Sequence, residues 1–390
     1  MIVPRSATIA VDGRLLKWAR ETAGLSDATL AKKMGIKQST KLEAWEAEGA
    51  RAEITARQLE RLADATKRPL AAFFLPDPPR EVALPDFRLA PTEKPQPLSS
   101  DALLAIRRGR RMQHVFADLS AELGQVERAR SPQIEKGARA EEAAARAREV
   151  VGVGIDDQTG WKDTAIALNV WRSRLEGLGL LVFQFAMPPE EVSGFSLANG
   201  TQAIVLNRKD HPSRRVFTLF HEWAHLLRGE AGLCEVNEGG DGPVDAEVFS
   251  NEFAGSFLVP MEALRESVPF ALHSERRATL DEAVKQAARL FSVSRYVILR
   301  RFLTAQVIDQ ETYRRTVAEW EAAPRPPKLK RKGKRGPPPY VLTVSELGRR
   351  FVSRVLVAHG GGFIGDGDLS DYLKLRLKHV DRLHEIVGVT

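Results

Sequence analysis

Two histidines and a glutamate lie in the apolar stretch LFHEWAHLLRGE, which spans positions 219 to 230. Residues four apart share a face of a helix, so His221 and His225 point the same way, with Glu222 beside them. Their neighbours are almost all apolar, which predicts a buried helix. Buried imidazoles and carboxylates need partners, and a divalent cation that binds both imidazoles satisfies this requirement.

A second interpretation of this stretch involves no metal. The two histidines would then donate to backbone carbonyls in the core, and Glu222 would form an ion pair with Arg215 or Arg228. The chain has 8 histidines among 390 residues. An HExxH arrangement is expected by chance in about one chain in a hundred of this composition. We therefore favour the metal site.

A third ligand is available downstream, in the segment DAEVFSNEFAGSFLVP from 245 to 260. Glu247 and Asn251 are four residues apart, so they share a face of the helix predicted there. Glu247 would complete a His₂Glu site with water in the fourth position, which is the catalytic form of a zinc site. Asn251 would accept a ring N–H from a liganding histidine. The rival third ligands are Asp245, Glu252 and Glu235.

Such a site is suited to peptide hydrolysis. Zinc lowers the pKa of its bound water towards about 7. Glu222 would take a proton from that water as it attacks a peptide carbonyl, and would pass it to the leaving amine. A further donor to the tetrahedral oxyanion would help; the candidates are His211, Arg214, Arg215 and Tyr296. These ligands do not separate Zn²⁺ from Mn²⁺ or Fe²⁺.

The elements that position these residues predict an α+β fold. The segment 164–179 has the pattern of a helix that ends in glycine, and 180–188 is rich in strand formers. The segment SGFSLANGTQAIVLN, 193–207, reads as a hairpin around Asn199-Gly200. Asp210 to Ser213 can then open the histidine helix. We expect a mostly helical domain with a small antiparallel sheet.

The segments SGFSL, IVLN, SRRVFTLFHEWAHLL and EVFSNEFAGSFLVP resemble the ImmA/IrrE family of metallopeptidases in order and spacing, over roughly Trp171 to Leu303. The resemblance implies a zincin-like domain that cleaves a DNA-binding repressor. It also implies zinc ligands at His221, His225 and Glu247, with Glu222 as the general base. Family members often have alanine where Ser250 stands here.

Residues 13 to 75 predict a compact, all-helical unit that resembles a lambda-repressor-like (Cro/C1-type, XRE) helix-turn-helix. Leu30, Ala31 and Met34 would pack its second helix, Gly35 would make the turn, and Leu42 and Trp45 would hold the third helix. Gln38, Ser39, Thr40 and Lys41 would open this recognition helix and face DNA. Glu43, Glu46 and Glu48 would repel phosphates. A helical bundle for protein contact or dimerisation is therefore the alternative.

The chain divides into six predicted parts. They are 10–75, the helix-turn-helix; 76–160, a Pro-rich joint and helical connector; 161–270, the zincin-like core; 271–323, a helical part; 324–340, a basic Pro/Gly-rich linker; and 341–390, a C-terminal helical segment. Part 271–323 is a candidate second helix-turn-helix, but core packing explains its apolar residues better. The linker has seven Lys or Arg residues and no acid, which equals the net charge of +7. We read it as a solvated connector rather than a nucleic-acid contact.

Composition places the chain among globular proteins, with 43% hydrophobic and 28% charged residues. There is no apolar run long enough for a membrane span and no secretion-signal pattern. The single cysteine, Cys234, excludes an internal disulfide. We expect a cytoplasmic location.

The sequence predicts a regulatory zinc endopeptidase that cleaves a repressor or an antitoxin-like protein, in stress response or mobile-element control. Its front end would bind DNA or a partner and would form homodimers. The alternative is a non-catalytic, DNA-binding transcriptional regulator or toxin–antitoxin component that uses the protease fold as a sensor scaffold. The intact HExxH motif and the available Glu247 favour the enzyme.

Overall fold

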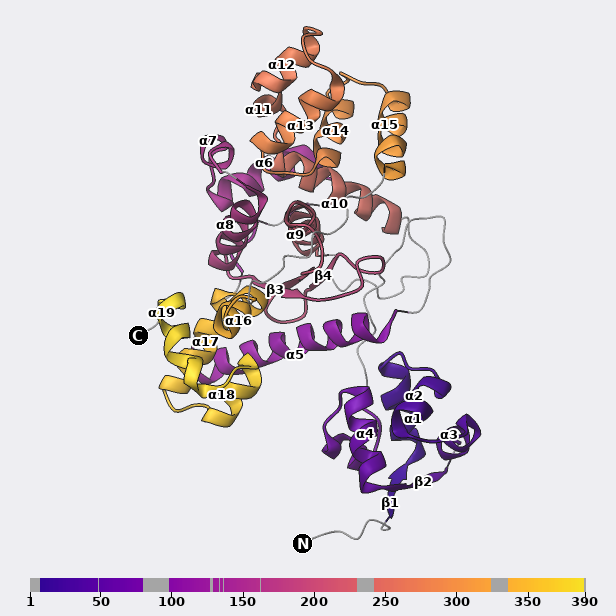
Figure 1. The fold of residues 1–390 in the computed structure, drawn as a ribbon. Coiled ribbons are helices and arrows are strands. Elements are labelled where there is room, and N and C mark those ends of the chain that lie inside the picture. The colour runs from indigo at the N-terminus through magenta and orange to yellow at the C-terminus, as the bar shows by residue number, and fades with distance from the viewer. Residues whose placement is uncertain are drawn as a thin grey trace. The chain divides into compact units, whose positions relative to one another are not determined.

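The computed structural model describes residues 8–47, 49–79, 98–126, 129–132, 134–135, 137–161, 163–229, 242–323 and 336–388, with the backbone alone for 242–244. The chain divides into two compact units, Met1–Arg108 and Gly109–Thr390 (Figure 1). Several predictions fall outside the described residues. They concern Glu48, Cys234, Glu235, residues 80–97 of the joint and residues 324–335 of the linker.

The N-terminal unit contains helices and a small strand ribbon. Its elements are β1 (Thr8–Asp12), α1 (Gly13–Thr22), α2 (Asp27–Met34), α3 (Ser39–Glu46), β2 (Arg51–Thr55), α4 (Ala56–Thr66) and the 3₁₀ helix η1 (Leu70–Phe74). Gly35 ends α2 in the left-handed region, with φ 76°. The side chains expected to pack α2 and α3 are buried: Leu30, Ala31, Met34, Leu42 and Trp45.

The expectation of an all-helical N-terminal unit is wrong in one respect. Strands β1 and β2 pair antiparallel, from Thr8↔Thr55 to Asp12↔Arg51. In β2, with the sequence RAEIT, apolar residues alternate with polar ones, and this period of two suits a half-buried strand. The pairing buries Val11, Ala52 and Ile54 in the core of the unit.

The second unit contains the remaining elements, apart from the first residues of α5. Its first part comprises α5 (Ser100–Glu122), α6 (Ala140–Val151), α7 (Ile155–Thr159), α8 (Thr164–Gly177), β3 (Leu181–Phe185), β4 (Gly194–Leu197), β5 (Ala203–Asn207), α9 (Pro212–Leu227) and α10 (Gly242–Leu258). Its second part comprises α11 (Met261–Glu266), α12 (Val268–Ser274), α13 (Leu280–Leu290), α14 (Arg295–Thr304), α15 (Gln310–Ala322), α16 (Pro339–Leu347), α17 (Arg349–Gly360), α18 (Asp366–Leu373), the 3₁₀ helix η2 (Leu377–His379) and α19 (Val380–Val387). The predicted α+β class is confirmed. Within the described residues, no helix has the length and apolar character needed to cross a membrane.

The sheet of the second unit has the order β3-β5-β4. Strand β4 is antiparallel to β5, as the hairpin prediction requires. Strand β3 runs parallel to β5, from Leu181↔Ala203 to Phe185↔Asn207, so the expected antiparallel sheet is in fact mixed. Strand β5 lies at the centre and the shorter strand β4 at one edge, while β3 and β5 are both buried at all five positions.

Helices cover both faces of this sheet (Figure 1). Helix α9 packs on one face, where Gly194 of β4 lies against Thr218. On the other face, Gly109 of α5 lies against Val205 and Phe195. Helix α17 packs on this same face through Phe351, whose ring centroid is 5.7 Å from that of Phe183. The sheet is therefore the middle of three layers.

A buried ion pair attaches the C-terminal helices to α8. Arg172 Nε donates to Glu176 Oε1 at 3.1 Å. The other carboxylate oxygen of Glu176 accepts the backbone N–H groups of Arg349, at 3.2 Å, and Arg350, at 3.4 Å, where α17 begins. Arg172 also donates to the carbonyl oxygen of Ser345 at 2.6 Å. Burial raises the pKa of Glu176, and Arg172 opposes that rise.

Candidate metal centre

Helix α9 carries the HExxH motif through the core. It begins as the sequence predicts, with Pro212 in the first turn. The ring of His211 accepts the N–H of Ser213 at 3.3 Å and so caps the helix. The helix is buried along most of its length, including Val216, Leu219 and Phe220. Its register is therefore set by packing, which fixes where the two histidines point.

Aromatic rings join α9 to α10. The rings of Phe220 and Phe257 are stacked with centroids 4.0 Å apart. Trp223 meets Phe253 edge-on at 6.1 Å, and Trp171 of α8 meets Phe257 at 5.4 Å. The apolar spacing of α10, with phenylalanines at 249, 253 and 257, places this face against α9. This packing holds the start of α10 beside the histidines.

Three side chains, two of them buried and that of Arg148 half-buried, bind the backbone carbonyls at the end of α10. Arg148 donates to the carbonyl of Phe257 at 2.8 Å, and Gln158 donates to that of Leu258 at 2.9 Å. Arg301 donates to the carbonyl of Val259 at 2.9 Å. Burial lowers the pKa of Arg148 to about 10. These donors satisfy carbonyls that a helix end leaves without intrahelical partners.

His221, His225 and Glu247 converge at one point. The two Nε2 atoms are 3.2 Å apart. Glu247 Oε2 lies 3.3 Å from His221 Nε2, and Oε1 lies 3.3 Å from His225 Nε2. One ligand atom from each of these three residues lies within 4.8 Å of the others. The histidine side chains are 15% exposed and that of Glu247 is 46% exposed, so one side of the cluster is open to solvent.

The chemistry of these donors fits a divalent cation. Hydrogen bonds from His221 and His225 hold the pKa of Glu247 well below its usual range, so the carboxylate is charged. When the Nε2 atoms of both rings are unprotonated, these two nitrogens and the carboxylate can offer lone pairs to a single point. His₂Glu with one open position is the ligand set of catalytic zinc sites. The sequence-predicted third ligand is thus the one that the structure brings to the histidines.

Glu222 is buried, with 9% of its surface exposed. The two arginines proposed as its ion-pair partners are engaged elsewhere. Arg215 donates to Gln184 Oε1, and the Arg228 guanidinium lies 4.5 Å from the centroid of the Phe249 ring. Within the described part of the chain, Glu222 forms no ion pair. The carboxylate of Glu222, the residue that follows His221 in α9, therefore has no countercharge from an arginine in the described structure.

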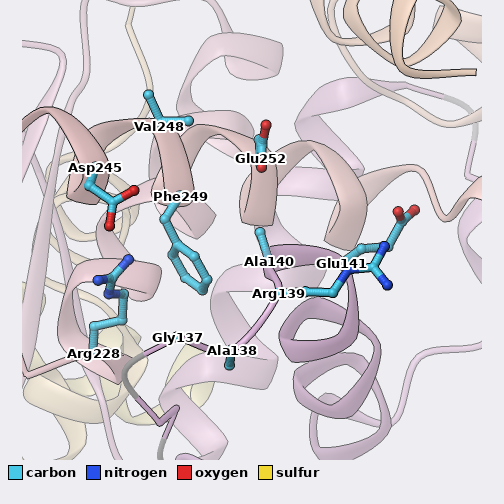
Figure 2. Close-up of a pocket in the computed structure, with 10 residues that line it drawn as sticks. All are labelled: Gly137, Ala138, Arg139, Ala140, Glu141, Arg228, Asp245, Val248, Phe249 and Glu252. Carbon is cyan, nitrogen blue, oxygen red and sulfur yellow. The ribbon is translucent and has the colours of Figure 1, made fainter. Parts of the chain in front are cut away.

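The rival ligands Asp245 and Glu252 lie on another face of α10. Successive helical residues are rotated by about 100°, which puts both positions roughly opposite Glu247. They line a pocket of about 360 Å³ between α10 and residues 137–141, together with Val248, Phe249 and Arg228 (Figure 2). This pocket does not include the cluster.

Asn251 does not make the contact expected of it. Its side chain is exposed and forms no hydrogen bond with a described residue. The Nδ1 atom of His221 is buried and likewise has no partner in the described structure. The predicted support of a histidine ring by Asn251 is therefore absent from this arrangement.

The four candidate oxyanion donors are occupied elsewhere. His211 caps α9. Arg214 Nε lies 3.6 Å from Asp210 Oδ2, and burial raises the pKa of Asp210. These residues precede His221 by seven to ten positions, or about 10–15 Å of helix. Burial lowers the pKa of Arg215, which contacts Gln184. Tyr296 packs edge-on against Trp320, with centroids 5.3 Å apart. The structure does not bring these four residues to the cluster.

The predicted DNA-facing residues lie at the start of α3. Gln38, Thr40 and Lys41 are exposed and Ser39 is half-buried. Lys41 Nζ lies 5.0 Å from the Trp45 ring centroid. Glu46, one of the acids expected to repel phosphates, instead turns inward, where its Oε2 accepts from Arg20 at 2.6 Å.

Sequence reasoning assigned no role to Gly194, Asn207 or Gln113, although all three bear on the strand beside Glu222. A Cβ atom at Gly194 would lie 3.7 Å from Glu222 Cγ and 2.5 Å from Thr218 Cγ2. The one available signal was a polar residue, Asn207, directly after the apolar run AIVL. A buried amide at such a position requires partners.

Residues 175–303 match the family model Peptidase_M78, described as the IrrE N-terminal-like domain. The matched region begins in α8, contains the sheet, α9 and α10, and ends in α14. No curated protein matches the chain. The match supports a metallopeptidase of the ImmA/IrrE kind, and such a peptidase implies a divalent metal ion.

Proposed function

We propose that the chain is a regulatory zinc-dependent endopeptidase. The observation that carries this proposal is the convergence of His221, His225 and Glu247, with the buried residue Glu222 directly after His221 in α9. The family match of the surrounding region supports it.

In the proposed mechanism, His221, His225 and Glu247 hold the metal. The metal supplies Lewis-acid chemistry, which activates water and polarises a peptide carbonyl. Glu222 is the general base that takes the proton of the attacking water and delivers it to the leaving amine. The ligands fit Zn²⁺ best, and Mn²⁺ or Fe²⁺ would also be accepted.

The edge strand β4 gives the substrate a place to bind. The N–H of Asn207 donates to the carbonyl of Ser193 at 2.8 Å. This bond shows which residues of β4 direct their backbone N–H and C=O groups toward β5, because such residues alternate along an antiparallel pair. By this alternation the backbone groups of Gly194 and Ser196 point away from β5. An extended peptide can pair with such an edge. Because Gly194 lies next to Glu222, the paired peptide would pass beside the general base.

The substrate we propose is a DNA-binding repressor or an antitoxin-like protein, cleaved in the cytoplasm during stress response or mobile-element control. The N-terminal unit would bring the peptidase to DNA. Exposed lysines surround the turn between α2 and α3; they are Lys32, Lys33, Lys37 and Lys41. The Arg20–Glu46 pair supports DNA binding because it neutralises an acid that would otherwise face phosphate.

The test is incubation of the full-length, zinc-loaded chain with the proteins encoded beside it. We expect a discrete new fragment that a chelator abolishes. Glu222→Gln should retain zinc and lose cleavage, because it removes the base and keeps the ligands. Glu252→Gln on the opposite face of α10 is the matched control and should cleave normally. Absence of zinc from wild-type protein under zinc-replete conditions would refute the enzyme. DNA binding without cleavage would instead favour a non-catalytic regulator.

A further inference from the structure

Asn207 is fully buried at the end of β5, and its carboxamide makes four hydrogen bonds to backbone groups. Its Oδ1 accepts the N–H of Met187 at 3.2 Å and that of Lys209 at 3.0 Å. Its Nδ2 donates to the carbonyls of Met187, at 3.1 Å, and Val192, at 2.8 Å. Three of the four bonds hold the connection between β3 and β4. The side chain therefore fixes the point at which β4 begins.

A second buried carboxamide holds the other end of β4. Gln113 of α5 is 4% exposed. Its Nε2 donates to the carbonyl of Leu197, the last residue of β4, at 3.3 Å. The same nitrogen donates to the carbonyl of Thr201, in the turn that follows, at 2.7 Å. We call the hydrogen bonds of Asn207 and those of Gln113 the two clamps of β4. An edge strand has a neighbour on one side only, so the clamps replace the restraint that a second neighbouring strand would give.

Between the clamps, β4 approaches α9 closely. A Cβ atom at Gly194 would lie 2.5 Å from Thr218 Cγ2 and 2.9 Å from the carbonyl oxygen of Val205. Only glycine permits this approach without a shift of the strand. The approach places β4 next to Glu222, so a small displacement of either strand end would move the open edge relative to the general base.

We propose that Asn207 and Gln113 are positioning residues of the peptidase site. They fix edge strand β4 at its two ends, so that an extended substrate peptide bound along it lies beside Glu222. This inference rests on the proposed function. Neither carboxamide belongs to the metal cluster, so both act through the backbone of β4. An amide is required at Asn207 because the site needs two acceptor bonds and two donor bonds from one side chain.

The first test is hydrogen exchange on the full-length, zinc-loaded chain. Asn207→Asp keeps the acceptors but loses the two donated bonds. The loss of two hydrogen bonds, at about 1 kcal/mol each, should make backbone amide exchange over residues 187–197 about thirtyfold faster. Gln113→Ala should accelerate exchange over 195–201, and it serves as the second variant if Asn207→Asp fails to fold. Thr316→Val, which loses one hydrogen bond in α15, is the control and should leave β4 unchanged. Unchanged exchange at β4 in both clamp variants would overturn the proposal.

The second test is the kinetics of cleavage of a quenched-fluorescent decapeptide, selected from a mixture with the wild-type enzyme. A displaced strand pairs less well with the peptide and also moves it relative to Glu222, so KM should rise by about tenfold or more and kcat should fall as well. A general folding defect would lower kcat at constant KM, and that result would overturn the positioning role. Zinc content should stay at the wild-type level, and its loss would also overturn the role. If wild-type protein cleaves nothing, the proposed function fails, whereas the exchange experiment still decides whether the clamps position β4.

Discussion

The substitution Glu176→Ala tests how the C-terminal helices are attached to the peptidase region. The side chains of Arg172 and Glu176 are 8% and 7% exposed, so the ion pair is almost dry. Alanine leaves the Arg172 guanidinium buried without its carboxylate. It also removes the acceptor for the N–H groups of Arg349 and Arg350 at the start of α17.

The expected cost follows from the loss of one partner. Breaking a buried pair on one side costs about 3–5 kcal/mol, because the remaining charge is uncompensated. Each stranded N–H adds about 1–3 kcal/mol if water cannot reach it. Entry of water into the space left by the side chain reduces this second contribution, so we expect a total near the first range. For the unit Gly109–Thr390 it corresponds to a fall in melting temperature of about 5–9 °C.

The assay is urea unfolding followed by circular dichroism, together with limited proteolysis near residue 336. Glu176→Gln keeps an acceptor for the two N–H groups and should lose less stability than Glu176→Ala. The control is Glu142→Ala, which removes a surface pair with Arg139 whose side chains are 77% and 56% exposed, and should cost less than about 1 kcal/mol. Equal effects of Glu176→Ala and Glu142→Ala would refute the reasoning, since burial of the pair would then have no consequence.

Two further predictions concern the turn of the N-terminal unit and the metal. Gly35→Ala should destabilise that unit by about 1–3 kcal/mol, because φ at Gly35 is 76° and the new Cβ would lie 2.3 Å from Arg61 Nη1. Thermal unfolding of the chain measures this loss, and an unchanged melting temperature would contradict it. Chelation should lower the melting temperature of wild-type protein, because a zinc concentration 100-fold above Kd stabilises by about 2.7 kcal/mol. Glu247→Ala should shrink this zinc-dependent shift in scanning fluorimetry, and a shift of wild-type size would exclude Glu247 as a ligand.

The sequence was most informative where spacing alone determines geometry. The four-residue interval of His221 and His225 puts both side chains on the same face of the helix, whatever surrounds it. The mixed sheet could not be predicted in the same way. Strands β3 and β5 are both buried at all five positions, so burial does not identify the central strand, and the hairpin pattern of 193–207 does not say on which side β3 will pair.

The clamps on β4 were beyond sequence reasoning for a different reason. Gln113 contacts Leu197 across 84 positions of the chain. Its sequence neighbourhood is an ordinary helical pattern rich in arginine, which gives no indication of a buried amide. The inward turn of Glu46 is a similar case, because its partner Arg20 lies 26 positions away. Contacts of this kind appear only when the fold is known.

The three donors that hold the final carbonyls of α10 have a mechanical consequence. These bonds fix one end of the helix, so that a tilt would pivot about residues 257–259, and Glu247 lies near the other end. The arm from Leu258 to Glu247 is eleven residues, or about 16 Å. A tilt of only about 4° at the pivot would swing the carboxylate by about 1 Å, several times the ±0.2 Å that metal–ligand bonds tolerate. The position of Glu247 at the proposed metal site thus depends in part on Arg148, Gln158 and Arg301, which bind the opposite end of α10.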